Sequence, residues 1–252
     1  MKQTIPNAVN YVIELSDIVL CILDARFIEE TRNYETEAKI KEFQHKRIIY
    51  VLNKADLAGH IEQKELNKLS PNVLVSCKTR RGVNELRNKI KIIGRQMDKK
   101  PIYVGVIGYP NTGKSSIINL ILGRKEIAKI SPESGFTKGV QKLKLSEDVY
   151  LLDSPGIIPA TERFNELVKL AKIGVKTYDR TDDPELVVHE LMKLHPGLFE
   201  EFYKIDAKGG SEIILEELGR KRGILMKGGI VDADRTARVI LRDWQKGRIK
   251  LL

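Results

Sequence analysis

A glycine-rich segment that ends in lysine and serine carries the clearest chemistry in this chain. Residues 108–115 form the sequence G-Y-P-N-T-G-K-S, directly after the apolar run 102–107 and before the helical stretch 116–122. Glycines let backbone N–H groups turn toward phosphates, and the start of a helix adds its positive dipole end. Lys114 would neutralise β- and γ-phosphates and Ser115 would ligate Mg²⁺. The segment predicts a phosphate-binding loop whose other contacts are Asn111, Thr112, Gly113 and Ser116.

A carboxylate follows a second apolar run, at residues 149–152. The sequence after it is Asp153-Ser154-Pro155-Gly156. A carboxylate at the tip of a buried strand near a phosphate loop anchors a nucleotide-bound Mg²⁺, and the Gly156 N–H can meet the γ-phosphate. Ordinary turns use the same residue types, so the motif alone is weak evidence. It indicates a nucleotide site because it follows a strand close to the phosphate loop.

Two further motifs are suited to recognising a purine base. Asn53-Lys54-Ala55-Asp56 closes the apolar run 48–52, and Ser76-Cys77-Lys78 follows the run 73–75. Asp56 can accept hydrogen bonds from the N1–H and the exocyclic amine of guanine, which adenine does not offer, while the stem of Lys54 covers the base. The backbone N–H of Cys77 would reach the guanine oxygen. The alternative is an Asn/Asp turn that caps the next helix.

The positive charge of the chain is concentrated in two stretches. Lys and Arg number 44 against 34 Asp and Glu, which gives a net charge of +10. Residues 78–100 carry nine basic against two acidic residues, and residues 220–252 carry ten against three. On a helix that begins at about residue 232 and is continued to residue 246, one face would be basic through Arg235, Arg238, Arg242 and Lys246. The opposite face would be apolar through Ala237, Ile240, Leu241 and Trp244. This helix suits an RNA phosphate backbone, although solvated helix faces would show similar charge.

Composition excludes several other classes of protein. Hydrophobic residues make up 42% of the chain and charged residues 31%, which favours a globular protein over a disordered one. The apolar run 18–23 is far shorter than the roughly 20 residues that span a bilayer, and no secretory signal follows Met1. Cys21 and Cys77 are too few for a disulfide framework or a zinc site. We expect a cytoplasmic protein with no membrane partner.

The order of apolar runs predicts an α/β domain followed by a helical one. Predicted strands cover 18–23, 48–52, 73–76, 102–107, 140–145 and 149–152, and predicted helices cover 36–43 and 83–93. Their alternation is typical of a mostly parallel sheet covered by helices. Beyond about residue 161 only helices are predicted, at 186–194, 213–218 and 232–244. We therefore place the α/β domain at 1–160 and a small all-α, RNA-binding domain at 161–252.

The motifs resemble those of the translation-factor class of GTPases, in a different order. In that class the phosphate loop comes first, then a switch threonine, D-x-x-G, N-K-x-D and S-A-K. Here N-K-A-D at 53 and S-C-K at 76 precede the phosphate loop at 108, the candidate switch Thr137 and D-S-P-G at 153. This order is similar to that of the circularly permuted P-loop GTPases of the YlqF type, also called ribosome biogenesis GTPase A. Asp24-Ala25-Arg26 and the segment around 234–243 resemble the same family.

The resemblance implies ligands, partners and some of the chemistry. It implies GTP and GDP as ligands, Mg²⁺ held by Ser115, Thr137 and Asp153, and ribosomal RNA or a precursor of the large subunit as the partner. Ile157 stands where many GTPases place a glutamine that orients the attacking water. No histidine that could take over this role is found before His45. The remaining candidates for catalysis are Lys114, Thr137 and, as a ligand of K⁺ in related GTPases, Asn111, which is equally suited to forming a turn. We expect slow intrinsic hydrolysis, activated in trans or by K⁺.

The sequence therefore predicts a GTP-hydrolysing switch that assists assembly of the large ribosomal subunit through contact with ribosomal RNA. The rival hypothesis is a non-catalytic RNA-binding scaffold that uses a guanine nucleotide as a structural ligand. A GTPase that acts on tRNA or at a membrane surface is disfavoured, because the chain carries no amphipathic or lipidation signal. We expect no DNA partner.

Overall fold

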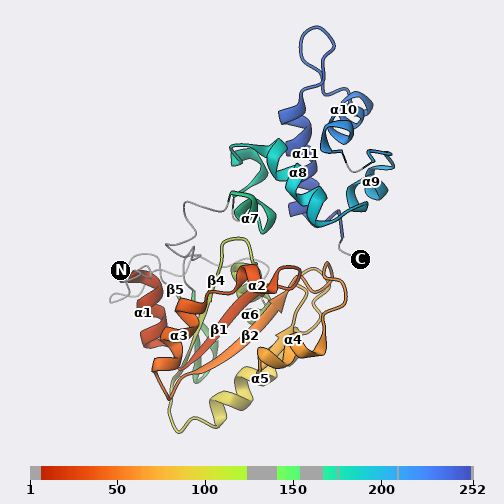
Figure 1. The fold of residues 1–252 in the computed structure, drawn as a ribbon. Coiled ribbons are helices and arrows are strands. Elements are labelled where there is room, and N and C mark those ends of the chain that lie inside the picture. The colour runs from red at the N-terminus through yellow and green to blue at the C-terminus, as the bar shows by residue number, and fades with distance from the viewer. Residues whose placement is uncertain (1–6, 124–140, 154–166, 175, 209, 251–252) are drawn as a thin grey trace. The chain divides into compact units, whose positions relative to one another are not determined.

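The computed structural model describes residues 7–123, 141–153, 167–174, 176–208 and 210–250. The chain divides into two compact units, residues 1–163 and 164–252 (Figure 1). Within the described ranges, every helix is too short or too polar to cross a lipid bilayer.

The first unit is built on a six-stranded sheet in the order β3-β2-β1-β4-β6-β5. The first five strands in this order run parallel, and β5 pairs antiparallel with β6. All six predicted strands are present, with ends that differ by at most two residues, so the predicted fold class is confirmed. In chain order the strands are β1 (Ile18–Asp24), β2 (Arg47–Asn53), β3 (Asn72–Leu74), β4 (Ile102–Gly108), β5 (Gln141–Ser146) and β6 (Val149–Asp153).

Helices cover both faces of this sheet and bury both sides of the central strand. Ile18, Leu20 and Ile22 of β1 pack in one apolar cluster with α5 (Val83–Arg95) and α6 (Lys114–Leu122). The alternate side chains of β1 pack in a second cluster with α1 (Asn7–Leu15) and α3 (Tyr34–Glu42). Burial of both faces explains why the strands appear in the sequence as continuous apolar runs. The predicted core face of α5 is confirmed by Val83, Leu86, Ile90 and Ile93.

Among the described residues of this unit, three helices are absent from the sequence prediction. They are α1, the single-turn α2 (Ile28–Thr31) and α4 (Gln63–Lys68). The two valines and one isoleucine of α1 have lower helix propensity than unbranched residues, so its contacts with the sheet decide its structure. α4 has six residues and buries none of them, so it gives no apolar periodicity to detect.

The second unit is helical and centres on the single tryptophan of the chain. Trp244 is 1% exposed, stacks on Phe199 with ring centroids 5.7 Å apart and donates its indole N–H to the Lys172 carbonyl at 3.0 Å. The three predicted helices are present, and α7 and α9 are additional. The elements are α7 (Leu167–Lys172), a 3-10 turn (Tyr178–Arg180), α8 (Pro184–Leu194), α9 (Leu198–Tyr203), α10 (Ser211–Arg222) and α11 (Ala233–Gln245).

Candidate nucleotide-binding site

The strand order brings the separated motifs to one edge of the sheet. Asn53 ends β2, Gly108 ends β4 and Asp153 ends β6, while Ser76 lies two residues beyond the end of β3. These strands are parallel, so their carboxyl ends lie at the same edge. Ligands of open α/β sheets bind outside the carboxyl ends of the strands. This edge is therefore the candidate site.

A direct hydrogen bond joins the N-K-A-D motif to the phosphate loop. The Asn53 side-chain amide donates to the Thr112 carbonyl at 2.7 Å, across 59 residues of sequence. Gly113 lies next to this bond with φ of +98°, and a Cβ there would lie 2.2 Å from the Asn53 amide nitrogen. Only glycine fits both the backbone conformation and the space. The loop and the motif are thus in direct contact.

The candidate base-recognition residues are also held together. The Ser76 hydroxyl donates to one oxygen of the Asp56 carboxylate at 2.6 Å, and it accepts from the Thr79 N–H at 3.1 Å. The Ala55 N–H donates to the Val75 carbonyl at 3.1 Å, which ties the loop after β2 to the segment after β3. Beside them, Cys77 is half-buried and Lys78 is exposed. The carboxylate of Asp56 is therefore fixed in orientation by its neighbours.

Lys114 is a buried cation held only by neutral groups among the described residues. Its ammonium donates to the carbonyls of Tyr109 at 2.7 Å and Gly108 at 3.1 Å, and the residue is 8% exposed. Burial lowers the pKa of Lys114 to about 8, while the charge of Asp153 acts in the opposite direction. A desolvated ammonium at the start of a helix, inside a loop of backbone N–H groups, fits an anionic phosphate.

The oxygen ligands expected for Mg²⁺ are described only in part. Ser115 and Ser116 are exposed in the first turn of α6, and Asp153 ends β6 in register with Val106 of β4. These hard oxygen donors fit a magnesium ion held mainly by phosphates. Asn111 is exposed, with φ of +61°. Thr137 and Gly156 lie outside the described residues.

A buried carboxylate in the middle of the site was not assigned a role from the sequence. Strand β1 lies between β2 and β4, and its last residue, Asp24, is in register with Asn53 and fully buried. The Lys54 ammonium lies 2.7 Å from one oxygen of Asp24. Arg26 donates to both oxygens, at 2.8 and 3.0 Å from its guanidinium and 3.1 Å from its backbone. Asp24 therefore fixes the lysine of the N-K-A-D motif.

The electrostatics of this cluster favour its charged form. Burial acts to raise the pKa of Asp24, but the hydrogen bonds and charge of Arg26, together with the charge of Lys54, lower that pKa below its ordinary value. Burial lowers the pKa of Lys54, and Asp24 opposes this change. One carboxylate thus lies between two cations. The sequence did contain a signal for the role of Asp24, because this acidic residue ends a buried strand and the next strand along the chain carries N-K-A-D.

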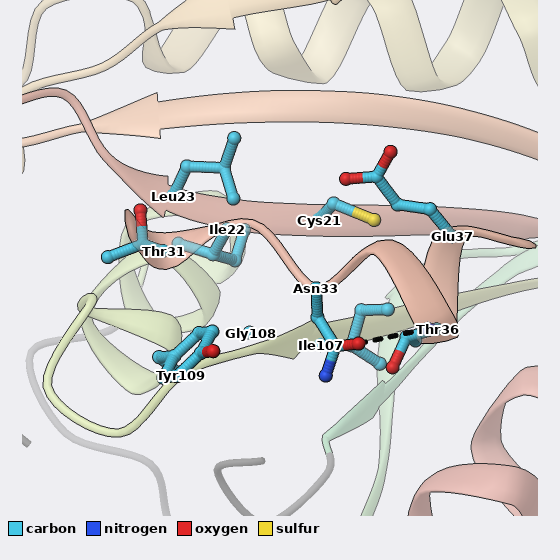
Figure 2. Close-up of a pocket in the computed structure, with 10 residues that line it drawn as sticks. All are labelled: Cys21, Ile22, Leu23, Thr31, Asn33, Thr36, Glu37, Ile107, Gly108 and Tyr109. Atoms are coloured by element: carbon cyan, nitrogen blue, oxygen red, sulfur yellow. Dashed lines mark hydrogen bonds between the residues drawn. The ribbon is translucent and has the colours of Figure 1, made fainter. Parts of the chain in front are cut away.

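A narrow cavity shares Gly108 and Tyr109 with the phosphate loop but lies on the side of the Asn33–Thr36 turn and contains none of the predicted base-binding residues. Figure 2 shows Tyr109 at one end and the Asn33–Thr36 turn at the other, where the Thr36 N–H donates to the Asn33 side chain at 3.0 Å. None of its ten lining residues is lysine or arginine. Its only acid, Glu37, is engaged by Arg32 and Tyr50. The cavity therefore does not offer phosphate recognition.

The predicted basic face of α11 is interrupted in its middle. Its apolar face is buried as expected, and Arg235 and Lys246 are exposed at its two ends. Arg238, however, forms a two-bond pair with Asp234 and donates to the carbonyls of Tyr178 and Thr181. Arg242 lies 3.7 Å from the buried Asp243. Arg242 forms no hydrogen bond through its Nε with the residues that the structure describes, and its side chain is 34% exposed, so the basic face is interrupted at Arg238, which Asp234 holds.

Comparison with solved structures identifies close matches to this fold. The GDP-bound structure of TM YlqF has a TM-score of 0.67 and 25% identity, and the match covers 96% of this chain and 95% of that one. GNP-bound YlqF from T. maritima has a TM-score of 0.67 and 26% identity, with coverage of 96% and 93%. A family model described as 50S ribosome-binding GTPase matches residues 103–204.

Curated relatives match almost the whole chain. An uncharacterized GTP-binding protein of Methanocaldococcus jannaschii is 37% identical over 251 residues, which are 98% of this chain and 66% of that protein. Nucleolar GTP-binding protein 2 of Saccharomyces cerevisiae is 35% identical over 257 residues, which are 98% of this chain and 52% of that protein. The chain thus spans between about half and two thirds of the length of these relatives.

Proposed function

Because the chain belongs to the circularly permuted GTPases of the YlqF type, we propose that it binds and hydrolyses GTP as a switch in the assembly of the large ribosomal subunit. The observation that carries the proposal is the hydrogen bond from Asn53 to the Thr112 carbonyl. It joins the motif suited to guanine with the motif suited to phosphates, although the two lie in reversed order in the chain. One ligand that contains both groups fits this arrangement.

Each residue of the candidate nucleotide-binding site then has a physical role toward the nucleotide. Asp56, fixed by Ser76, accepts the two guanine donors, and the stem of Lys54, fixed by Asp24, covers the base. Lys114 exchanges its carbonyl partners for phosphate oxygens, which are stronger acceptors for a buried ammonium. The backbone of residues 111–116 and the start of α6 supply N–H groups to the phosphates. Binding energy therefore comes from groups that are already in position.

Hydrolysis requires a metal and an oriented water molecule. Ser115 and Asp153, with Thr137, would hold Mg²⁺, which neutralises charge on the phosphates when it is bound. Lys114 would stabilise the same developing charge. We propose Asn111 as a ligand of K⁺, since Ile157 has no polar atom with which to orient water. Slow turnover that depends on an activator follows from this set of residues.

The partner proposed is ribosomal RNA or a precursor of the large subunit. The family description supports this class of partner, as does the excess of ten basic over three acidic residues in 220–252. Of the four basic residues predicted on α11, Arg235 and Lys246 are exposed and suited to phosphate contacts. Arg242 is partly exposed and can contribute, whereas Arg238 would contribute only if RNA displaced Asp234.

Single-turnover hydrolysis of GTP, with and without large ribosomal subunits, tests the proposal. In K⁺ buffer we expect slow hydrolysis alone and at least a tenfold increase with subunits; equal rates in K⁺ and Na⁺ would remove the role of Asn111. Lys114→Ala is the matched variant and should abolish the increase. Nucleotide binding without any hydrolysis, with or without subunits, would instead support the non-catalytic scaffold.

A further inference from the structure

A tight β-hairpin separates α10 from α11. Leu225 and Val231 form a β-bridge, and the Met226 N–H donates to the Ile230 carbonyl at 2.8 Å. Gly228 and Gly229 close the turn with φ of +92° and +79°, a conformation that other residues rarely adopt. We call residues 224–231 the α10–α11 hairpin. Its backbone is defined by its own hydrogen bonds.

The base of the hairpin is anchored to the helical unit. Val231 is 5% exposed, and a Cβ on Gly219 of α10 would lie 2.3 Å from its side chain. The Ile224 N–H donates to the Gly219 carbonyl at 2.8 Å, and the Asp232 N–H donates to the Ile224 carbonyl at 3.0 Å. A glycine in α10 therefore allows the hairpin to pack closely, and the projecting part is held in one orientation.

The projecting part is apolar and exposed. Leu225 is 44% exposed, Met226 52% and Ile230 62%. Figure 1 shows the segment between α10 and α11 extending away from both helices. Three large aliphatic side chains gathered on one projecting turn contribute little to the fold of the unit, and clustered exposed apolar side chains mark interaction sites.

The charge around this apolar tip is positive. Lys227 lies in the turn and Arg235 in the first turn of α11, and neither has a side-chain partner among the residues that the structure describes. The two nearby acids are engaged: Asp232 accepts from the Arg235 N–H, and Asp234 is paired with Arg238. Arg220, Lys221 and Arg222 end α10 immediately before the hairpin, but Arg220 pairs with Glu216 and Arg222 lies 3.7 Å from Asp243. Lys227 and Arg235 are therefore the cations of the tip that are available to a partner. A polyanion with apolar faces complements this surface.

We propose that the α10–α11 hairpin is an RNA-contacting element, in which Lys227 and Arg235 bind phosphates while Leu225, Met226 and Ile230 pack on unstacked bases. This inference rests on the proposed contact with ribosomal RNA and names the surface that makes it. Unpaired bases in RNA loops expose flat apolar faces beside phosphates. Aliphatic wedges flanked by basic residues are a known way to contact nucleic acids. A rigid hairpin presents both kinds of group without an ordering cost at the tip.

Two pairs of variants test the proposal through the salt dependence of RNA binding. Met226→Ser with Ile230→Ser removes apolar surface, and Lys227→Ala with Arg235→Ala removes charge. The matched control is Leu186→Ser with Ile213→Ser, which changes aliphatic side chains that are 44% and 42% exposed on α8 and α10. The probe is deproteinised large-subunit ribosomal RNA, titrated with the full chain at several salt concentrations.

The two pairs should differ in a way that plain structural damage does not produce. The charge pair should weaken binding and reduce the salt slope by about 1.4, since each contact to single-stranded RNA contributes about 0.7. The apolar pair should raise Kd about tenfold at an unchanged slope, with unchanged thermal unfolding. The control pair should bind as the parent chain does.

Other outcomes overturn the inference in distinguishable ways. Parent-like Kd values for the apolar pair would eliminate the hairpin as an RNA contact while leaving the proposed function intact. An apolar pair that loses affinity for intact subunits but not for the free RNA would point to a ribosomal protein as the occupant, against our proposal. If the parent chain binds neither subunits nor RNA, both the function and this inference fail.

Discussion

Asp24 offers the sharpest test of the candidate site, because its carboxylate ends the central strand β1 and holds Lys54, which is proposed to cover the base. Asp24→Asn keeps the shape of the side chain and removes its charge, so the cations of Arg26 and Lys54 lose their shared anion. Loss of one partner from a buried ion pair destabilises a protein by about 3–5 kcal/mol. Lys54 retains 22% exposure and can regain water, whereas Arg26 at 3% cannot. We therefore expect a loss near the lower limit, about 3 kcal/mol.

This loss should be confined to the first unit and should extend to the nucleotide. For a unit of this size it corresponds to a decrease in Tm of roughly 6–12 °C. Because Lys54 would no longer be fixed over the base, the Kd for GDP should rise at least tenfold, or about 1.4 kcal/mol. The pKa of Asp24 is lowered in the folded state, so its contribution is present at neutral pH and is lost on acidification. The variant should therefore show a weaker decline in stability with acid than the parent.

Asp17→Asn is the matched control. Asp17 is 4% exposed, lies 2.7 Å from the Lys99 ammonium and accepts from the Tyr103 N–H, but it precedes β1 and is at the opposite edge of the sheet. Far-UV circular dichroism follows both units and Trp244 fluorescence follows the helical unit, so a transition seen by circular dichroism alone belongs to the first unit. Fluorescent GDP reports affinity. The positioning role of Asp24 would be refuted if Asp24→Asn bound GDP with the Kd of the parent chain and lost no more stability than Asp17→Asn.

Three further predictions address the base, the phosphates and the helical unit. Asp56→Asn should lower affinity for GDP and raise it for xanthosine diphosphate, since an amide can donate to the second xanthine oxygen; retained guanine selectivity in competition binding contradicts the assignment. Lys114 has a pKa of about 8, so above that pH the binding of GDP must take up a proton. The affinity for GDP should therefore fall about tenfold from pH 7 to pH 9. Calorimetry at pH 8.5 in two buffers should detect the proton uptake. Asp243→Asn should destabilise the helical unit by about 2 kcal/mol, because buried Asp243 accepts from Tyr203 and Arg248; denaturation followed by Trp244 fluorescence measures this, and an unchanged midpoint argues against it.

The strands and the motif positions could be predicted from sequence because both depend on local pattern. Buried parallel strands are continuous apolar runs, and each motif follows its strand directly, so Asn53 and Thr112 could be predicted as site residues before their hydrogen bond was known. The pairing of Asp24 with Lys54 depends on β1 lying between β2 and β4, which periodicity does not encode. Arg238 is a different case. Its pairing with Asp234 follows an i,i+4 spacing and could have been predicted from the sequence. The helical wheel missed the pair because it gives the direction of a side chain and not its partner.

The central position of β1 has a consequence for the biogenesis of the protein itself. A ribosome that translates this chain releases the strands of the proposed base-recognition motifs first, and β1, β2 and β3 can pair while the other half of the sheet is still unsynthesised. One side of β1 must then wait for β4, whose Val104 pairs with Ile18 more than eighty residues later. Until that partner emerges, the nascent sheet exposes an open edge along its most apolar strand. A guanine nucleotide that spans both halves would act late, as a ligand that fastens the second half to the first.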